Sequence, residues 1–247
     1  MNDFSQILSQ LSGLKLQGMA RAVESELNEA EAQKVSYIGF LQSLLQSEVS
    51  WRRERKLKRN LAGAHFSAIK KLEDFDVRKV KGITKADLAN LLDLRWLDNH
   101  TNLLFFGPPG VGKTHLAISL GLKAVEAGYT VCFERMTNLI RLLKTAEFQR
   151  SASFRVSRLQ KTDLVILDEI GYTPIEKKEA NLFFNLISEL YEKNSVIITS
   201  NKSFDHWAEM LGDQIMTTAL LDRLLHHAKI FSLDGESYRI KQRKEEK

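Results

Sequence analysis

The sequence predicts an α/β fold, a three-layer sandwich with a parallel sheet between helices, preceded by a smaller all-helical region. Beyond about residue 75, short apolar runs alternate with helical patterns, whereas the region before it has helical spacing and no proline. Apolar strands that alternate with helices are typical of parallel sheets buried on both faces. We therefore predict a helical domain at 1–75, an α/β core at 76–240 and a basic tail at 241–247.

The N-terminal region contains two series of apolar residues at helical spacing. The first runs from Leu8 to Val23, and Gly13 is expected to interrupt it. Ser36 is a suitable N-cap for a second helix, which we expect to continue to about Leu61. Both series predict helices with one apolar face.

Five apolar runs are predicted strands: residues 102–106, 130–133, 164–167, 196–199 and 230–233. Helices are expected at 113–127, 136–146 and 176–192. Gly128 is placed to close the first of these helices.

Composition excludes several classes of protein. With 247 residues, of which 43% are apolar, the chain can bury a sizeable core, yet no window is apolar enough to predict a membrane span. The N-terminus lacks the pattern of a signal peptide, so we expect a cytoplasmic protein. A single cysteine, Cys132, excludes an internal disulfide and a cysteine-based zinc site, and its apolar neighbours predict a buried core residue.

The strongest motif is a glycine-rich loop between a predicted strand and a predicted helix. It reads GPPGVGKT from residue 107 to 114 and fits the P-loop pattern GxxxxGK[ST]. Glycines let successive N–H groups converge on phosphate oxygens, and the helix adds its positive N-terminal end. Lys113 is expected to reach the β- and γ-phosphates of ATP, and Thr114 to offer its hydroxyl to Mg²⁺. The candidate nucleotide-binding residues are Gly107, Pro108, Pro109, Gly110, Val111, Gly112, Lys113, Thr114 and His115.

Two carboxylates, Asp168 and Glu169, follow the predicted strand at 164–167. Ligands bind at the carboxyl ends of strands in open α/β sheets. We expect Asp168 to hold Mg²⁺ together with Thr114, and Glu169 to orient and deprotonate an attacking water molecule. Many strands end in acidic residues, but after a complete P-loop this pair indicates hydrolysis of the nucleotide.

Two further residues are candidates with open alternatives. Asn201 follows the strand at 196–199 and is expected to hold the attacking water or sense the γ-phosphate, unless it only forms a strand-to-loop turn. Arg223 lies in an apolar helix, where it either stabilises charge at a neighbour's γ-phosphate or forms a surface ion pair with Asp222 or Glu209. His226 and His227 would point about 100° apart on a helix, so we expect no shared metal site there.

The net charge of +5 permits binding to a polyanion without showing it. Two basic clusters are candidate contacts with DNA phosphates, and each has the alternative of a solvated helix face or a partner surface. The first cluster comprises Arg52, Arg53, Arg55, Lys56, Lys58 and Arg59, and the second comprises Lys144, Arg150, Arg155 and Arg158, near Arg141. The pattern of a zinc finger is absent, and no clear helix-turn-helix is evident, which favours recognition of the DNA backbone.

The chain resembles the IstB-like helper ATPases of bacterial insertion sequences, which belong to the initiator branch of AAA+ proteins beside DnaA and the helicase loader DnaC. The resemblance covers nearly the whole chain and rests on GPPGVGKTHLA, DLVILDEIGY, ITSN and LLDRLLHHAKI, with LSGLKLQGMARA and FLQSLLQSE in the N-terminal region. It implies an ATPase that binds double-stranded DNA and helps a transposase to use its target. Walker A residues would be Lys113 and Thr114, Walker B residues Asp168 and Glu169, sensor 1 Asn201 and the arginine finger Arg223.

An arginine finger that acts in trans implies an ATP-dependent homo-oligomer with its site between subunits. Many AAA+ proteins carry a helical lid after the core, and here we expect none, so no sensor 2 residue can be named. Two alternatives stay open: a DnaC-like loader of a replicative helicase, and a metabolic phosphotransferase. The second is disfavoured, because a glutamate beside Asp168 suits the activation of water.

Overall fold

The computed structural model describes residues 3–171 and 174–238. It forms two compact units, Met1–Arg59 and Asn60–Lys247. The domain boundary near residue 75 stays a prediction, and the basic tail at 241–247 lies outside the described residues. None of the described helices is long and apolar enough to cross a membrane.

The first unit is helical, as predicted. It contains α1 (Asp3–Gly13), α2 (Gln17–Gln33) and most of α3 (Tyr37–Ala64). Ser36 caps α3, since its Oγ accepts a hydrogen bond of 3.1 Å from the backbone N–H of Gly39. The start of α2 is held by Glu48, whose buried carboxylate accepts from the backbone N–H groups of Gly18 and Met19.

The second unit contains a five-stranded sheet in the order β3-β4-β5-β2-β6, and every neighbouring pair is parallel. The strands are β2 (Asn102–Phe106), β3 (Val131–Arg135), β4 (Leu164–Ile170), β5 (Ser195–Ser200) and β6 (Ala228–Ser232). These are the five predicted strands, shifted at their ends by three residues or fewer. The predicted parallel α/β sheet is therefore confirmed.

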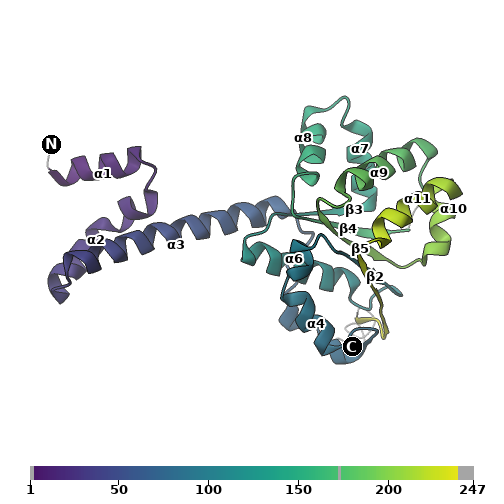
Figure 1. The fold of residues 1–247 in the computed structure, drawn as a ribbon, viewed down its shortest axis with the longest axis horizontal. Helices are drawn as coiled ribbons and strands as arrows, with labels where there is room; N and C mark the ends of the chain where they lie inside the picture. The colour runs from purple at the N-terminus through teal and green to yellow at the C-terminus, as the bar shows by residue number, and fades with distance from the viewer. Residues whose placement is uncertain (1–2, 172–173, 239–247) are drawn as a thin grey trace, which may run out of the picture. The chain divides into compact units, whose positions relative to one another are not determined.

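Helices cover both faces of this sheet (Figure 1). They are α4 (Lys85–Leu92), α5 (Arg95–Asp98), α6 (Lys113–Ala127), α7 (Met136–Thr145), α8 (Arg150–Leu159), α9 (Lys177–Leu190), α10 (Trp207–Leu211) and α11 (Gln214–Leu225), and the short 3-10 turns are η1 (Leu72–Asp74), η2 (Val77–Lys79) and η3 (Phe204–His206). Of these helices, α4, α5, α8, α10 and α11 have no bounds among the helices predicted from sequence.

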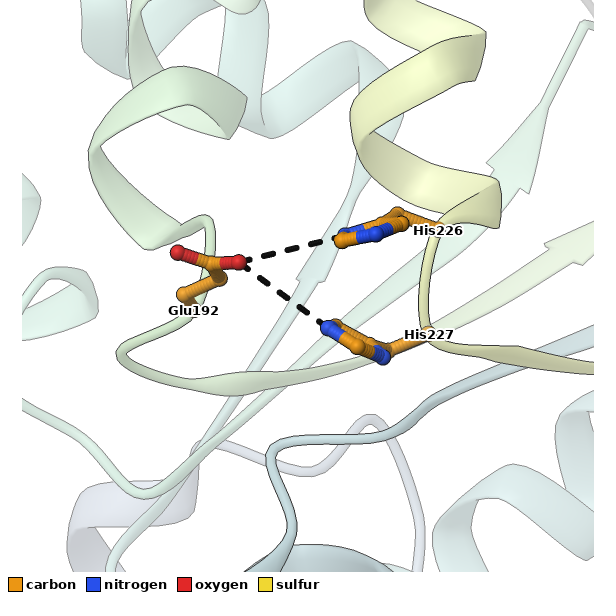
Figure 2. Close-up of side chains that lie close together, drawn as sticks. All are labelled: Glu192, His226 and His227. Atoms are coloured by element: carbon orange, nitrogen blue, oxygen red, sulfur yellow. Dashed lines mark ion pairs between the residues drawn. The ribbon is translucent and has the colours of Figure 1, made fainter.

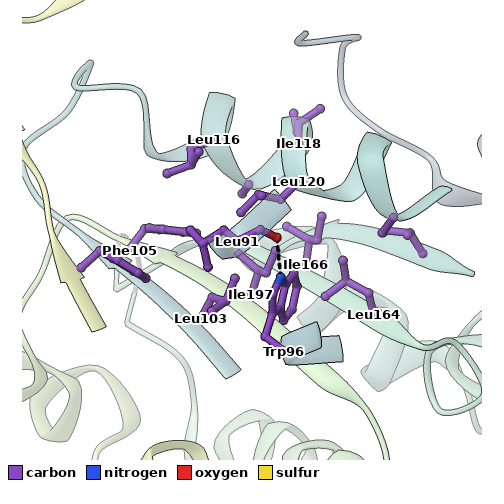
Figure 3. Close-up of a cluster of buried hydrophobic side chains, with 14 of the residues drawn as sticks. Leu91, Trp96, Leu103, Phe105, Leu116, Ile118, Leu120, Leu164, Ile166 and Ile197 are labelled. Carbon is purple, nitrogen blue, oxygen red and sulfur yellow. Dashed lines mark hydrogen bonds between the residues drawn. The ribbon is translucent and has the colours of Figure 1, made fainter. Parts of the chain in front are cut away.

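Successive side chains along each strand point to opposite faces of the sheet, so the core is divided into two layers. Leu103 and Phe105 of β2 pack on one face with α6, α4 and α5, whereas Leu104 packs on the other with α7, α9, α10 and α11. Figure 3 shows the first layer, where the α6 side chains lie over β2 and its neighbours and Trp96 Nε1 donates to the Leu91 carbonyl at 2.8 Å. Because all five strands are parallel, their carboxyl ends lie at the same edge of the sheet.

A short antiparallel pair lies beside this edge. It joins β1 (Val80–Lys81) to β7 (Asp234–Gly235), with Val80 opposite Gly235. The described residues after β6 end at Tyr238 and include the strand β7, so the expectation that no helical lid follows the core stays a prediction. The segment from Leu233 to Tyr238 therefore continues directly from the sheet toward the loop that follows β2.

Candidate nucleotide-binding site

The glycine-rich loop connects β2 to α6, and three glycines give it its shape. Gly107, Gly110 and Gly112 have φ angles of 144°, 85° and 101°, a region that side chains with a Cβ rarely adopt. The first residue of α6 is Lys113, which is nearly buried, and its Nζ donates to the carbonyls of Gly107 at 2.6 Å and Pro108 at 2.8 Å. The predicted lysine therefore lies folded over its own loop.

The segment after β6 packs directly against this loop. Added Cβ atoms would lie 2.0 Å from the Leu233 carbonyl oxygen at Gly107 and 2.1 Å from Ser237 Oγ at Gly110. Hydrogen bonds hold the two segments together, since Tyr238 N donates to the Gly110 carbonyl at 3.1 Å. Glycine is thus required here by close packing as well as by conformation.

The buried carboxylate of Asp168 lies between Thr114 and Thr199, two residues that line the cavity described below. Its Oδ1 accepts from Thr114 Oγ1 at 2.7 Å and from Thr199 Oγ1 at 2.6 Å. The residue has no exposed surface, and Oδ2 has no hydrogen-bond partner within the described part of the chain. A buried carboxylate oxygen beside a threonine hydroxyl is the oxygen donor set that Mg²⁺ prefers, so these residues fit the metal.

Glu169 extends from a bulge in β4. The ladder between β4 and β5 shifts register between Leu167 and Ile170, and Glu169 has a φ of 63°. Its backbone N–H donates to Thr199 Oγ1 at 3.0 Å, while its carboxylate is about half exposed and lies 4.0 Å from Arg135 Nε. A strained conformation of a residue other than glycine is typical of functional sites.

A cavity of about 930 Å³ brings these residues together. It is lined by Lys113, Thr114, Glu169, Asn201 and, from the flanking segments, Phe75 and Tyr238. Its volume falls in the range of small-molecule sites. Asn201 Oδ1 is buried without a described hydrogen-bond partner, which marks a group available to a ligand.

One wall of the cavity comes from a segment that sequence reasoning left unassigned. Residues 67–70 line it, and two hydrogen bonds tie the chain there to α6: Ser119 Oγ donates to the Lys70 carbonyl at 2.8 Å, and His115 Nε2 lies 2.7 Å from the Lys71 carbonyl. The His115 ring also lies 5.7 Å from that of Phe75. Residues 67–70 and Tyr238 do not belong to any recognisable sequence motif, so the sequence alone could not assign them to the site.

Arg223 lies outside this cavity. Its Nη1 donates to the Ala219 carbonyl at 2.8 Å, and its guanidinium carbon lies 4.9 Å from the ring centroid of Phe184. Among the residues placed by the structure, it forms no ion pair with Asp222 or Glu209. The structure therefore does not bring Arg223 to the phosphate loop of its own chain.

Several candidate DNA-binding residues have intramolecular partners. In the first cluster, Arg52 pairs with Glu48 at 2.6 Å and Lys58 with Glu54 at 2.7 Å. The Arg55 guanidinium lies 4.9 Å from the centroid of the Trp51 ring. Arg52, Lys58 and Arg55 stay at the protein surface in spite of these contacts, and the structure does not show what they bind.

In the second cluster, Lys144 pairs with Glu179 at 2.8 Å, and Arg155 pairs with the buried Glu134 at 2.6 Å. Burial raises the pKa of Glu134, and Arg155 opposes this rise. Arg155 is therefore part of the packing between α8 and β3. Phe148 and Phe154, beside this cluster, are largely exposed.

Cys132 is buried in β3, as predicted. Burial raises the pKa of its thiol to about 11, so it stays protonated at neutral pH. This side chain belongs to the core and not to the candidate site.

Known proteins resemble this chain along most of its length. The family model of IstB-like ATP binding proteins matches residues 9–246. An ATP-binding protein of insertion sequence IS21 from Pseudomonas aeruginosa is 42% identical over 95% of this chain and 88% of its own length. A counterpart in insertion sequence IS5376 of Geobacillus stearothermophilus is 36% identical over 94% of this chain and 92% of its own length.

Solved structures show the same fold at low identity. DnaI superposes with a TM-score of 0.56 and 16% identity over 66% of this chain and 90% of its own. The DnaC helicase loader superposes with a TM-score of 0.53 and 21% identity over 67% of this chain and 97% of its own. AMPPCP-bound DnaA from Aquifex aeolicus superposes with a TM-score of 0.53 and 22% identity over 74% of this chain and 56% of its own. The fold is thus the one found in DnaI, DnaC and DnaA, and the chain belongs to the family of IstB-like ATP-binding proteins.

Proposed function

We propose that this chain hydrolyses ATP with the help of Mg²⁺, assembles on double-stranded DNA as an ATP-dependent oligomer, and serves there as the helper of an insertion-sequence transposase. One observation carries the proposal: Asp168 accepts a hydrogen bond from Thr114, the last residue of the phosphate loop, through Oδ1, while its buried Oδ2 has no described partner. A buried carboxylate with an unsatisfied oxygen is costly unless a cation completes it.

The phosphate loop and α6 account for binding. Backbone N–H groups of the loop and the N-terminus of α6 offer a positive field to the phosphates. Lys113 Nζ exchanges its bonds to the carbonyls of Gly107 and Pro108 for bonds to phosphate oxygens. Thr114 and Asp168 would hold Mg²⁺, which neutralises charge that develops on the phosphates during hydrolysis.

Glu169 is the proposed general base. Its half-exposed carboxylate lines the cavity, and the residue lies within the bulge of β4, directly after the buried Asp168. It orients a water molecule for attack and accepts its proton. Asn201, with an unpaired amide oxygen in the same cavity, is placed to accept a hydrogen bond from that water molecule.

The position of Arg223 supports an active site shared between subunits. It belongs to α11 and lies outside its own nucleotide cavity, so it can stabilise transition-state charge only at a neighbour's site. ATP bound between two chains would then promote assembly. This is the basis of the proposed homo-oligomer.

Binding to duplex DNA is proposed on charge. Arg53, Lys56 and Arg59 form no ion pair with described residues, and Arg150 of α8 is similarly exposed without a partner. Contacts from such residues to phosphates give affinity that tolerates any sequence and falls with salt.

The transposase is proposed as partner because relatives at 42% and 36% identity are ATP-binding proteins of insertion sequences. The likeness to DnaI and DnaC keeps a helicase loader as the alternative. The two functions differ in the DNA form that should stimulate hydrolysis.

The shared site is tested by mixing two variants. Arg223→Ala and Glu169→Gln should each be inactive alone, whereas a mixture regains activity, because one interface then combines an intact Glu169 with a neighbour's intact Arg223. ATP turnover is measured with duplex DNA, with single-stranded DNA and without DNA. Stimulation by duplex DNA supports the helper, preference for single strands supports the loader, and no recovery in the mixture contradicts the shared site.

A further inference from the structure

Three exposed side chains meet at the edge of the sheet opposite the nucleotide cavity, where β5 and β6 begin. Figure 2 shows Glu192, which precedes β5, facing His226 and His227, which precede β6. Glu192 Oε1 lies 3.8 Å from His226 Nδ1 and 3.9 Å from His227 Nε2. One donor atom from each residue lies within 4.8 Å of the other two.

The sequence-based expectation that the two histidines diverge is wrong. It assumed that both belong to one helix, but α11 ends at Leu225 and the histidines form the turn into β6. Their ring centroids are only 4.1 Å apart. The turn therefore aligns two imidazole rings that a continuous helix would separate.

The backbone beneath the cluster is fixed by one buried side chain. Asn102 Nδ2 donates to the Leu224 carbonyl at 2.9 Å, and Asn102 Oδ1 accepts from Val196 N at 2.9 Å. Its own N–H donates to the His227 carbonyl at 2.7 Å. Asn102 thus links the end of α11, the start of β2 and the start of β5, so the scaffold of the cluster is rigid.

Glu192 is also held in an unusual conformation. Its φ is 57°, in the left-handed region that residues with a Cβ rarely adopt. Such conformations persist where the surroundings determine them, and they are concentrated at functional sites.

We propose that Glu192, His226 and His227 form a binding site for a divalent transition-metal ion of the Zn²⁺ class. Two imidazoles and one carboxylate are ligands that Zn²⁺ accepts, whereas Mg²⁺ prefers oxygen donors and keeps its water. Ligand atoms around tetrahedral Zn²⁺ lie roughly 3.3 Å apart, given bonds of about 2.0–2.1 Å. All three side chains are about half exposed, so they have room to move closer together around an ion.

Tyr191 is the competing group. Its hydroxyl lies 2.7 Å from His226 Nδ1, within hydrogen-bonding distance of that nitrogen. Binding of a metal through this nitrogen requires the hydroxyl to turn away. Tyr191 is therefore a competitor for His226 and not a ligand.

A bound ion would connect the loop after α9 to the end of α11. The same two helices are joined by Phe184 of α9 and Arg223 of α11. The site thus offers a metal-dependent link beside the candidate arginine finger.

The test is calorimetric titration of ZnCl₂ into the full chain without an affinity tag, in buffer with excess Mg²⁺ to occupy oxygen-donor sites. We expect one ion per chain, and the double variant His226→Ala/His227→Ala should bind at least about tenfold more weakly, since even losing an outer partner costs a metal site 10- to 100-fold. Glu192→Gln should also weaken binding. Co²⁺ absorption in the visible range reports the same site independently.

Two further variants test whether Zn²⁺ binds specifically at this cluster. His206→Ala removes an exposed histidine elsewhere and should leave Zn²⁺ affinity unchanged, and Tyr191→Phe should bind at least as tightly as the unchanged chain. Thermal unfolding of each variant without metal checks that it is folded. Absence of binding heat, or equal affinity in the double variant, would overturn the proposal.

Discussion

The two edges of the sheet hold their polar groups in opposite ways. At the carboxyl edge, Asp168 is completely buried and one of its oxygens has no described partner. At the amino edge, Asn102 is also buried, but both of its amide atoms and its N–H are hydrogen bonded. The carboxylate at one edge thus lacks a hydrogen-bond partner for one oxygen, whereas the amide at the other edge has a partner for each of its polar atoms.

This difference separates residues that await a ligand from residues that stabilise the fold. An unsatisfied buried carboxylate costs free energy in the absence of a ligand, whereas a satisfied amide gains stability and specifies one arrangement. Substitutions around Asp168 at the carboxyl edge should therefore change nucleotide binding and turnover, and substitution of Asn102 at the amino edge should change the free energy of unfolding.

The largest effect is expected for Glu169→Gln. Removing a general base slows proton transfer by about 10²- to 10⁴-fold, while the amide keeps the shape of the side chain. ATP affinity should stay close to that of the unchanged chain, because Glu169 is not one of the residues that grip the phosphates. Steady-state release of phosphate and equilibrium binding of ATP separate the two quantities, and unchanged turnover would dismiss Glu169 as the base.

Asn102→Ala should lower the stability of the fold without changing ATP binding. It leaves the Val196 N–H and the Leu224 carbonyl without their partner in a buried place, at a cost of about 3 kcal/mol in the free energy of unfolding. ATP affinity of the folded variant should be unchanged. Denaturant unfolding measures the effect, and Asn138→Ala, on the exposed side of α7, is the matched control with little expected change. An equal loss in both variants would argue against the network.

Arg155→Ala tests how a buried carboxylate that has an ion-pair partner, Glu134, differs from Asp168. Glu134 is buried and paired with Arg155, so the substitution leaves a buried charge uncompensated, at a cost of about 2 kcal/mol after allowance for the partly exposed guanidinium. Arg150→Ala, also on α8, is the control that should lower DNA affinity without this loss of stability.

The cost of Arg155→Ala should depend on pH. Burial raises the pKa of Glu134 above its usual value of 4.5, and loss of Arg155 raises it further. A raised carboxyl pKa in the folded state means that stability falls as pH rises from the unfolded to the folded value. The destabilisation should therefore be largest at neutral pH and shrink as pH approaches 4.5, and a cost independent of pH would contradict this account.

Local sequence predicted the strands, the phosphate loop and the pair Asp168 and Glu169, because these depend on periodicity and on neighbouring residues. It could not predict that Thr199 binds Asp168, since that contact joins two strands. The packing of Ser237 and Tyr238 on Gly110 likewise follows from the return of the chain after β6.

The histidines illustrate the same limit. Their spacing suggested divergence, and only the end of α11 at Leu225 reverses that expectation. Glu192 is far from them in sequence and has no motif. Such clusters arise from tertiary packing, which residue spacing does not reveal.

The central claim is that a nucleotide with its metal binds between the glycine loop and the end of β4. Calorimetric titration of ATP with Mg²⁺ into the unchanged chain tests it most directly, with Lys113→Ala as the matched variant. The account predicts one molecule bound per chain and a loss of about 2–5 kcal/mol of binding free energy in the variant. Absence of heat from folded protein, or equal affinity in Lys113→Ala, would contradict it.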